Sequence, residues 1–373
     1  MGSSKLFTPM KVGPLELKHR VIMAPLTRFR ATTEHVHTEL ATEYYTQRAS
    51  VPGTLLFTEA TFISPQAGGN KCVPGIWNEP QIKAWKDITD AVHAKESYIG
   101  CQLWALGRQA EPSNLNKEGP YPYVSASDVA LPDKPKPRAL TKDEIETYVA
   151  DYAQAAVNAR KAGFDLVELH SANGYLPNQF ISKKSNIRTD EYGGSLENRL
   201  RFPKQCLSAI VDKIGQERTG IRLSPFSTFG DMSTDQADDY IAFIEWIRDT
   251  YPSLAYLHVV ESRISGNADV DNGESTDPML HAWRVKDKTR PFLTAGGYKA
   301  DSGKQVADVK DVAVVYGRYF ISNPDLPLRL AYDRELQPYD RSTFYLFGPS
   351  HARGYTDQPF DESLKGKTIS ARL

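Results

Sequence analysis

The sequence has little cysteine, no long apolar run and almost no net charge. Its 373 residues include three cysteines, Cys72, Cys101 and Cys206, which lie far apart and form no CxxC pair. This spacing indicates neither a disulfide framework nor a zinc site. The formal net charge is −1, and no block of Lys or Arg occurs, which argues against nucleic acid as a partner. Because the apolar runs are short, we expect no membrane span.

The two ends of the chain carry little targeting information. Residues 1–7 lack the apolar stretch of a signal peptide, so we expect a cytoplasmic protein. The last three residues, Ala371-Arg372-Leu373, are a small-basic-Leu ending similar to the Ser-Lys-Leu peroxisomal address. Peroxisomal import is therefore the alternative location.

What the sequence does have is an alternation of β-branched runs with helical stretches. With 40% hydrophobic residues, the chain can bury a large core. The candidate strands are residues 21–24, 54–61, 98–103, 166–170, 220–224, 255–260, 292–295 and 312–316. Alternation of this kind is typical of βαβ units around a parallel sheet, and a closed barrel needs eight strands. We therefore predict an α/β fold in which residues 1–373 form a single (β/α)8 TIM barrel.

Two of the intervening helices have recognisable starts. Thr141-Lys142-Asp143-Glu144 is a capping box, and Gly163 is placed to end the same helix in a left-handed conformation. The buried face expected for this helix is Ile145, Tyr148, Tyr152, Ala155, Ala159 and Ala162. A second box, Ser233-Thr234-Asp235-Gln236, is expected to open the helix that carries Ile241, Ile244 and Ile247.

One connection is much longer than the others. Residues 105–140 contain six prolines and follow the third predicted strand. In a (β/α)8 barrel the carboxyl ends of the strands form the catalytic face. We therefore expect a long capping segment after strand 3, which acts as a lid rather than as a linker between domains.

The fourth predicted strand ends in a cluster of polar side chains. His170 and Asn173 are hydrogen-bond donors three residues apart, and they converge on one oxygen if the chain curls after His170. Two donors on a carbonyl oxygen polarise it and stabilise the enolate that forms when hydride adds to a conjugated β-carbon. Tyr175 is then placed to protonate the α-carbon. The alternative is that His170 is a structural histidine, and the motif alone leaves both open.

The last two predicted strands end in a pattern that favours phosphate binding. Gly296 and Gly297 follow the seventh strand, and Gly317 and Arg318 follow the eighth. Glycines let backbone N–H groups approach a phosphate, and the loops after strands seven and eight are the recurrent phosphate site of this fold. No GxGxxG or Walker A motif occurs, so a mononucleotide such as FMN suits the pattern better than a Rossmann dinucleotide.

Three further residues are distributed to hold the edge of a flavin ring. Thr27 follows the first strand, Gln102 ends the third and Arg222 lies on the fifth. A cation beside the ring's N1–C2=O side would favour the anionic reduced flavin. The competing interpretation is that Arg222 is paired structurally.

At this point the sequence resembles a known family, the Old Yellow Enzymes, from about Leu6 to Phe360. The matching motifs are Ala24-Pro25-Leu26-Thr27-Arg28, Ser64-Pro65-Gln66-Ala67-Gly68-Gly69, Gln102-Leu103-Trp104, His170-Ser171-Ala172-Asn173-Gly174-Tyr175-Leu176, Tyr192-Gly193-Gly194-Ser195-Leu196-Glu197-Asn198-Arg199 and the run from Tyr316-Gly317-Arg318 to Asp325-Leu326. Several independent motifs in one order make a chance match negligible.

The resemblance implies an FMN-binding barrel that reduces activated C=C bonds with NADPH or NADH in two half-reactions. It implies His170 and Asn173 as the pair that binds the carbonyl, Tyr175 as the proton donor and Trp104 as a wall of the substrate pocket. The FMN-contacting positions that it implies are Pro25, Thr27, Gln102, Arg222, Gly296, Gly317 and Arg318, with Phe344 and Tyr345 near the cofactor's edge. The expected partner is a small enone or enal, and the chain is expected to be a monomer or a homodimer.

The chain also departs from the family's pattern. Ala60 stands where many members have Gly, and Gly297 stands where many have Asn, although a small residue still permits backbone contact with FMN. Thr27 follows Leu26, which places the chain with the members that have Thr rather than Cys. The closest resemblance is to fungal members, including those acting on chanoclavine aldehyde. Some of those lack the tyrosine and isomerise their substrate, so Tyr175 favours net reduction here.

Several other functions compete with ene-reduction as interpretations of the sequence. A metal-dependent barrel hydrolase would have to recruit His35-Val36-His37, which lies well past the first strand without an obvious set of carboxylates. A non-catalytic flavin-binding protein would not explain two donors and an acid together. Within the family, isomerisation and reduction of nitro compounds are the alternatives.

Overall fold

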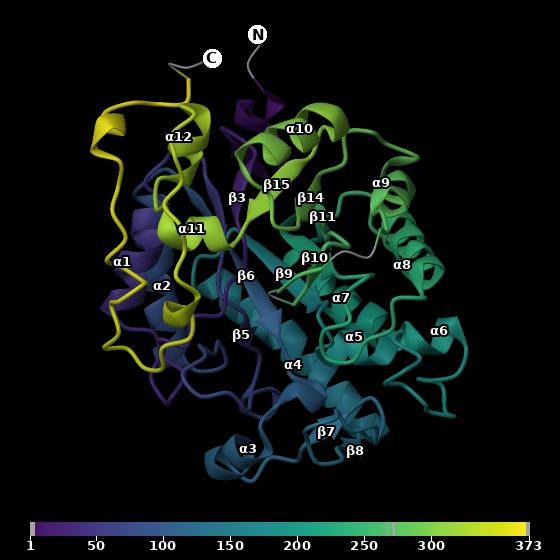
Figure 1. The fold of residues 1–373 in the computed structure, drawn as a ribbon. Helices are drawn as coiled ribbons and strands as arrows, with labels where there is room; N and C mark the ends of the chain where they lie inside the picture. The colour runs from purple at the N-terminus through teal and green to yellow at the C-terminus, as the bar shows by residue number, and fades with distance from the viewer. Residues whose placement is uncertain (1–3, 267, 271–272, 371–373) are drawn as a thin grey trace.

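The barrel is a closed ring of eight parallel strands in the described part of the chain, residues 4–266, 268–270 and 273–370 of a computed structural model (Figure 1). The ring strands are β3 (Val21–Met23), β4 (Leu55–Phe57), β6 (Tyr98–Trp104), β9 (Leu166–Ser171), β10 (Thr219–Leu223), β11 (Tyr256–Val260), β14 (Phe292–Ala295) and β15 (Ala313–Tyr316). Each strand pairs in parallel with the next, and the pairing of β4 with β6 closes the ring. The predicted TIM barrel is therefore confirmed.

The predicted strands agree with the observed ones to within a residue or two, except at the second. Residues 54–61 form two pieces, β4 and β5 (Thr61–Phe62), and not one strand. The backbone N–H of Gln102 donates to the hydroxyl of Thr58, at 3.1 Å, instead of to a carbonyl of the neighbouring strand. The N–H of Glu59 donates to the hydroxyl of Tyr45. These side-chain acceptors interrupt the ladder, so the strand ends at Phe57 and resumes at Thr61.

Helices surround the ring of strands. Their bounds are α1 (Glu39–Arg48), α2 (Glu79–His93), α3 (Pro112–Glu118), α4 (Lys142–Lys161), α5 (Leu176–Ile181), α6 (Leu196–Arg199), α7 (Arg201–Ile214), α8 (Ala237–Thr250), α9 (Asp277–Arg284), α10 (Ala300–Lys310), α11 (Arg318–Ser322) and α12 (Leu326–Ala331). The capping box of α4 is confirmed, because Thr141 accepts from the N–H of Glu144 while the Glu144 carboxylate accepts from the N–H of Thr141. Gly163 follows α4 with a φ of +91°. The six predicted apolar residues of α4 and its end are all buried.

The second capping box is wrong. Helix α8 begins at Ala237, and no side chain caps its first turn. The carboxamide of Gln236 is instead buried, where it accepts from the N–H of Lys183 and donates to Asp239. Because Gln236 ties the start of α8 to the chain after α5, the reciprocal contact with Ser233 does not form.

A short hairpin closes the end of the barrel where its strands begin. Strands β1 (Met10–Val12) and β2 (Leu15–Leu17) pair in an antiparallel manner. Val12, Leu15 and Leu17 pack against Ile22, Leu55, Leu166, Tyr256 and Ala313 of the ring. The opposite end of the barrel, where the strands stop, is therefore the one left for a site.

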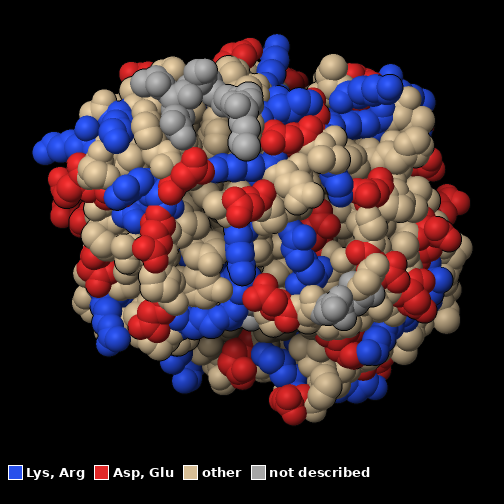
Figure 2. All heavy atoms as spheres, turned by 45° about the horizontal axis from the view of Figure 1, so that its top comes forward, with Lys and Arg blue, Asp and Glu red and all other residues tan. Residues whose placement is uncertain are grey.

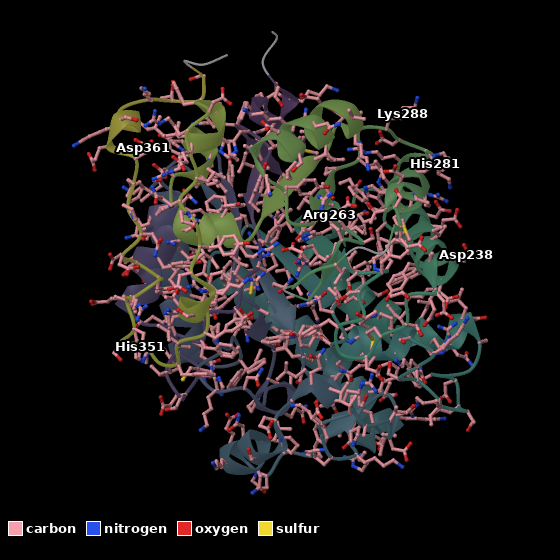
Figure 3. All side chains as sticks on the ribbon, in the orientation of Figure 1. Asp238, Arg263, His281, Lys288, His351 and Asp361 are labelled. Carbon is pink, nitrogen blue, oxygen red and sulfur yellow. The ribbon has the colours of Figure 1, made fainter. Side chains whose placement is uncertain are left out.

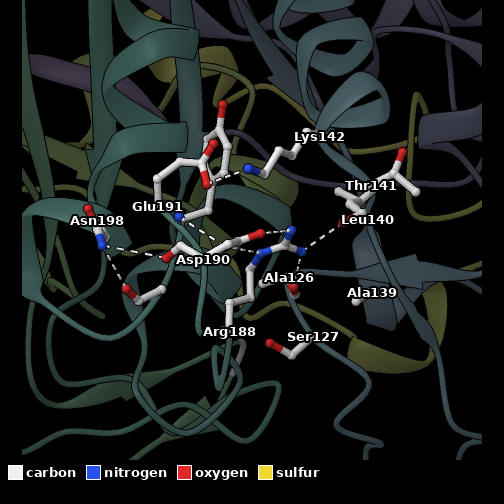
Figure 4. Close-up of polar contacts among 12 residues, drawn as sticks. Ala126, Ser127, Ala139, Leu140, Thr141, Lys142, Arg188, Asp190, Glu191 and Asn198 are labelled. Carbon is white, nitrogen blue, oxygen red and sulfur yellow. Dashed lines mark hydrogen bonds and ion pairs between the residues drawn. The ribbon is translucent and has the colours of Figure 1, made fainter.

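The segment of residues 105–140 contains α3 and two short strands, β7 (Val124–Ser125) and β8 (Arg138–Ala139), which pair in parallel. Arg188 anchors it, because the guanidinium donates to the carbonyls of Ala126 and Leu140, at 2.9 and 2.7 Å, while the Asp190 carboxylate holds the same guanidinium (Figure 4). This attachment ties the segment to the loop before α6. The covering role expected for it stays a prediction.

Three buried arginines hold the C-terminal segment against the barrel. Arg28, Arg30 and Arg48 are at most 1% exposed, and they donate to backbone carbonyls of residues 343–355, in the yellow part of the chain that passes α1 (Figure 1). Arg30 alone donates to five carbonyls, four of which belong to that segment. The segment carries Phe344 and Tyr345, so these contacts bring the end of the chain to residues near its start.

The surface carries charges of both signs. On the face in Figure 2, Lys and Arg side chains are interspersed with Asp and Glu. Within the described residues, no helix combines the length and the apolarity needed to cross a membrane. The C-terminal tripeptide on which the peroxisomal alternative depends lies outside the described residues.

We predict that Arg30→Met lowers the free energy of unfolding by about 3 kcal/mol, because it leaves several buried carbonyls without a donor. Urea unfolding measures this. The matched control is Arg353→Met, whose side chain is 75% exposed and whose change should stay within about 0.5 kcal/mol. Equal effects of the two substitutions would contradict the role of Arg30 as a clamp.

Candidate active site

A cavity of about 430 Å³ opens at the carboxyl ends of the strands. Its walls contain every site residue predicted from the sequence: Pro25, Thr27, Ala60, Gln102, Trp104, His170, Asn173, Tyr175, Arg222, Gly296, Gly297, Gly317, Arg318, Phe344 and Tyr345. These residues span almost the whole chain, and the closed ring of strands brings them to one place.

The chain curls directly after β9, as the spacing of His170 and Asn173 requires. Asn173 and Gly174 are both left-handed, with φ of +53° and +67°. The N–H of Asn173 donates to the hydroxyl of Ser224, at 2.7 Å, and its carbonyl accepts from Gln109. A Cβ on Gly174 would lie 2.8 Å from the carbonyl oxygen of Phe229. The turn therefore needs glycine at this position.

His170 is a neutral donor in this environment. Burial lowers the pKa of its imidazole well below the ordinary value, and the charge of Arg222 lowers it further. The backbone N–H of Ala172 approaches Nδ1 at 3.4 Å, which assigns the acceptor role to Nδ1 and leaves the proton on Nε2. A neutral imidazole with an Nε2–H can donate to a carbonyl oxygen without adding a full charge to the cavity.

Tyr175 lies between Trp104 and His170. Its ring centroid is 4.8 Å from that of each neighbour, with nearly perpendicular planes. Burial raises the pKa of the Tyr175 hydroxyl, and Tyr345 adds to the rise while Arg222 opposes it. The hydroxyl therefore keeps its proton at neutral pH and is available as an acid.

Polar groups from inside the barrel form the floor of the cavity. Gln102 and Arg222 both line it, and Arg222 Nε is buried without a hydrogen-bond partner among the described residues. Asn173 Oδ1, which also lines the cavity, is likewise buried without a hydrogen-bond partner among the described residues. Unpaired buried donors and acceptors are costly, so their presence together in one cavity indicates a polar ligand.

The glycines and Arg318 lie at the other end of the cavity. Gly297 has a φ of +63°, and a Cβ on Gly317 would lie 3.3 Å from Leu26 Cδ2. Arg318 lines the expected phosphate site but has a partner that the sequence did not suggest. Its guanidinium forms a bidentate ion pair with Asp269, at 2.5 and 2.7 Å. The Asp269 side chain is 62% exposed. The Arg318 side chain is only 16% exposed, so solvent weakens the pair mainly at Asp269, and a phosphate must compete with Asp269 for the donors of Arg318.

Several lining residues were missed by sequence reasoning. Lys299 and Tyr298 follow the glycines after β14, where their proximity to Gly297 was the available signal. Asp269 and Ile264, by contrast, lie in residues 261–277, which the sequence favours as part of the pocket wall, and they come from the hairpin of β12 (Ile264–Ser265) and β13 (Ala268–Asp269). Figure 3 places Arg263, at the start of this hairpin, toward the centre of the view, where it donates to the Gly296 carbonyl. No sequence signal pointed to Tyr339, which comes from the C-terminal segment.

The two histidines of the HxH pair face different partners. His35 lies 3.4 Å from the carboxylate of Glu118, whereas His37 lies 3.4 Å from that of Glu59. Among the described residues, no group of three or more His, Cys, Asp or Glu side chains is arranged to hold a metal ion. The pair therefore does not supply the ligand set that a metal-dependent hydrolase would require.

Comparison with known proteins assigns the class. Residues 5–337 match the family described as NADH:flavin oxidoreductase / NADH oxidase, and the chain belongs to this family. It is thus a flavin-dependent oxidoreductase of the Old Yellow Enzyme type.

Individual members of the family are similar to the chain over nearly its whole length. The chain is 50% identical to the chanoclavine-I aldehyde reductase of Penicillium roqueforti, over 99% of both chains. Among solved structures it is similar to the Old Yellow Enzyme of Pichia sp., with 37% identity, a TM-score of 0.87 and coverage of 96% of this chain and 94% of that one. Morphinone reductase matches with 39% identity and a TM-score of 0.86 over 97% of each chain.

The cavity fits FMN, the cofactor of this family, for which NAD(P)H is the hydride donor. FMN combines a flat ring that has polar edges with a phosphate. The unpaired Nε of Arg222 and the carboxamide of Gln102 suit the ring. The glycines after β14 and β15 leave room for a phosphate, and Arg318 and Lys299 supply positive charge there.

We predict that the imidazole of His170 does not titrate between pH 5 and 8. Burial, and after it the charge of Arg222, lower its pKa well below the ordinary value for histidine. The measurement is the pH dependence of the histidine ring signals by NMR, with the His170 signal assigned from its loss in His170→Gln. His93 is the internal control, because its hydrogen bond to Asp165 raises its pKa. A His170 signal that shifts near pH 6.5 would contradict the neutral donor.

Proposed function

We propose that the protein is an FMN-dependent ene-reductase that reduces the C=C bond of an α,β-unsaturated aldehyde or ketone. The observation that carries this proposal is the grouping of a neutral donor, His170, with Asn173 and a protonated Tyr175 in the cavity that suits FMN. When bound, FMN accepts hydride from NAD(P)H and supplies it from N5 to the β-carbon of the substrate. The residues of the chain bind, orient and protonate the substrate.

His170 and Asn173 are proposed to bind the carbonyl oxygen of the substrate. Both side chains can donate, and the left-handed curl at Asn173 brings its side chain back toward the strand end that carries His170. Negative charge develops on the carbonyl oxygen as hydride arrives at the β-carbon. Preorganised donors in a cavity with little water stabilise that charge more than water would.

Tyr175 is proposed to protonate the α-carbon. Its raised pKa means that the proton is present at the start of the reaction. The ring contacts with Trp104 and His170 hold the side chain in one orientation, beside the proposed carbonyl site. A tyrosine in this position favours net reduction over isomerisation, because it completes the addition of H⁻ and H⁺ across the double bond.

The remaining lining residues are proposed to bind FMN. Pro25, Thr27, Ala60, Gln102 and Arg222 would surround the ring, with Phe344 and Tyr345 at its edge. Gly296, Gly297, Gly317 and Arg318 would bind the phosphate, for which Arg318 must leave Asp269 or share its donors with it. Binding of a phosphate dianion would offset the loss of an ion pair in which only the Asp269 side chain is exposed.

The substrate class is proposed from the walls of the cavity. Trp104 and Tyr175 form an aromatic wall, and the partly exposed rings of Phe229 and Tyr345 extend it toward solvent. Aromatic walls favour flat or bulky apolar substrates. The similarity to a chanoclavine-I aldehyde reductase supports an aldehyde of this kind. The segment of residues 105–140, which follows Trp104 directly, is proposed to cover this side of the cavity.

We predict that the purified protein is yellow, that NADPH bleaches it under anaerobic conditions, and that an α,β-unsaturated aldehyde or ketone restores the colour. The matched control is the saturated aldehyde, which has no C=C bond and should leave the flavin reduced. Absorption in a stopped-flow instrument follows both half-reactions. A protein that no unsaturated carbonyl compound reoxidises would overturn the proposal.

We further predict that Tyr175→Phe leaves reduction by NADPH unchanged and slows the oxidative half-reaction by roughly 10²–10⁴, the usual effect of losing a general acid. Tyr152→Phe is the control, because Tyr152 lies on α4 outside the site and its buried hydroxyl has no partner in the described part of the chain. Full turnover of the enone by Tyr175→Phe would show that the proton comes from another group.

A further inference from the structure

A buried carboxylate lies inside the barrel beneath the proposed flavin site. Glu168 is on β9, two residues before His170, so both side chains point to the inside of the ring. Glu168 is fully buried. One of its oxygens accepts from Gln102 Nε2 at 2.7 Å, and the other lies 2.8 Å from His258 Nδ1. The mechanism described above gives Glu168 no role.

The carboxylate is charged despite its burial. Burial alone would raise the pKa of Glu168, but its pairing with His258, the charge of Arg222 and the hydrogen bond from Gln102 outweigh burial and hold the pKa below its ordinary value. Burial lowers the pKa of His258 itself, so His258 acts here as a neutral donor. A buried charge is costly unless it is paired and hydrogen-bonded. The buried charge of Glu168 is therefore stable only while its hydrogen-bond and charge partners are all present.

Glu168 fixes the orientation of the Gln102 carboxamide. A carboxylate can only accept hydrogen bonds, so the side of Gln102 that faces Glu168 is its NH₂ group. The carbonyl oxygen of Gln102 is thereby left to face the cavity, which Gln102 lines. Oriented in this way, Gln102 offers an acceptor to a ring N–H, and the second hydrogen on Nε2 remains for a ring carbonyl.

Glu168 also balances the charge of Arg222. The strand register pairs Arg222 directly with His170 on one side and with His258 on the other. Burial disfavours the charged guanidinium, and Glu168 is the largest influence that opposes this effect. A cation beside the flavin stabilises the anionic reduced form. A carboxylate next to that cation reduces the stabilisation.

We propose that Glu168 is a positioning residue for the flavin, which holds Gln102 with its carbonyl oxygen toward the ring and offsets the charge of Arg222. The inference rests on the proposed function, because it requires Gln102 and Arg222 to contact the flavin. Two effects follow. Loss of Glu168 should weaken the binding of oxidised FMN, and it should shift the flavin toward the reduced form.

The test compares Glu168→Gln, which removes the charge, with Glu168→Asp, which keeps the charge but is too short to hold Gln102. The measurements are the affinity of the apoprotein for oxidised FMN, from flavin fluorescence, and the midpoint potential of the bound flavin. Glu168→Gln should bind oxidised FMN about tenfold more weakly and favour reduced over oxidised flavin about tenfold more, which is ~30 mV for a two-electron couple. Glu168→Asp should lose affinity with an unchanged potential. Glu144→Gln, at the capping box of α4, is the control and should change neither.

The outcomes separate the parts of the inference. An unchanged potential in Glu168→Gln would overturn the charge balance, and unchanged FMN affinity in both variants would overturn the orientation of Gln102. If Glu168→Gln does not fold, a double-mutant cycle of FMN affinity uses Glu168→Asp, Gln102→Leu and the variant that carries both substitutions. The double variant should bind FMN no more weakly than Gln102→Leu alone, because Glu168 acts on affinity through Gln102. Additive losses would overturn the inference.

The single variant Gln102→Leu distinguishes this inference from the proposed function. If Gln102→Leu weakens FMN binding but the Glu168 variants do not, only the inference fails. If Gln102→Leu itself leaves FMN affinity unchanged, the proposed position of Gln102 at the flavin is wrong, and the inference falls with it. The reduction of enones by the same protein remains testable on its own through the two half-reactions.

Discussion

The pairing of β4 with β6 closes the ring of strands, and the position of every site residue depends on this closure. In this pairing Leu55, Leu56 and Phe57 lie opposite Tyr98, Ile99 and Gly100. Gly100 has no side chain, and a Cβ there would lie 2.7 Å from the ring of Phe57. Because all the strands in a closed parallel ring end at one rim, residues as far apart in sequence as Pro25 and Arg318 become walls of the same cavity.

The inside of the barrel changes from apolar to polar along single strands. On β9, Leu166 packs against the β1–β2 hairpin, Glu168 is fully buried among polar partners, and His170 reaches the cavity. The three residues alternate with outward-facing ones, as the period of a strand requires. The hairpin seals the lower end with apolar side chains, so the charged groups above it are separated from solvent on that side. This arrangement strengthens the electrostatic effects of Glu168 and Arg222, because little water screens them.

The sequence was sufficient to predict the barrel, all but one of its strands to within a residue or two, and many of the residues that line the cavity. The β-branched runs of the strands are a local pattern that can be recognised without knowledge of tertiary contacts. The curl after His170 follows from a glycine beside an asparagine. It was not sufficient where a side chain replaces a backbone partner. The hydroxyl of Thr58 breaks the second predicted strand, and the buried Gln236 displaces the start of α8. The ion pair of Arg318 with Asp269 joins residues 49 positions apart, and no local pattern signals it.

The two proposed catalytic groups, His170 and Tyr175, are already in the protonation states that the reaction requires before the substrate binds. Burial is the main cause of both pKa shifts, and it acts in opposite directions on an imidazole and on a phenol. The same environment therefore keeps His170 unprotonated and Tyr175 protonated. Arg222 lowers both pKa values, which favours neutral His170 but works against the proton on Tyr175. Burial outweighs Arg222 at Tyr175, so the pKa of the phenol stays raised and the cavity holds a neutral donor and an acid together.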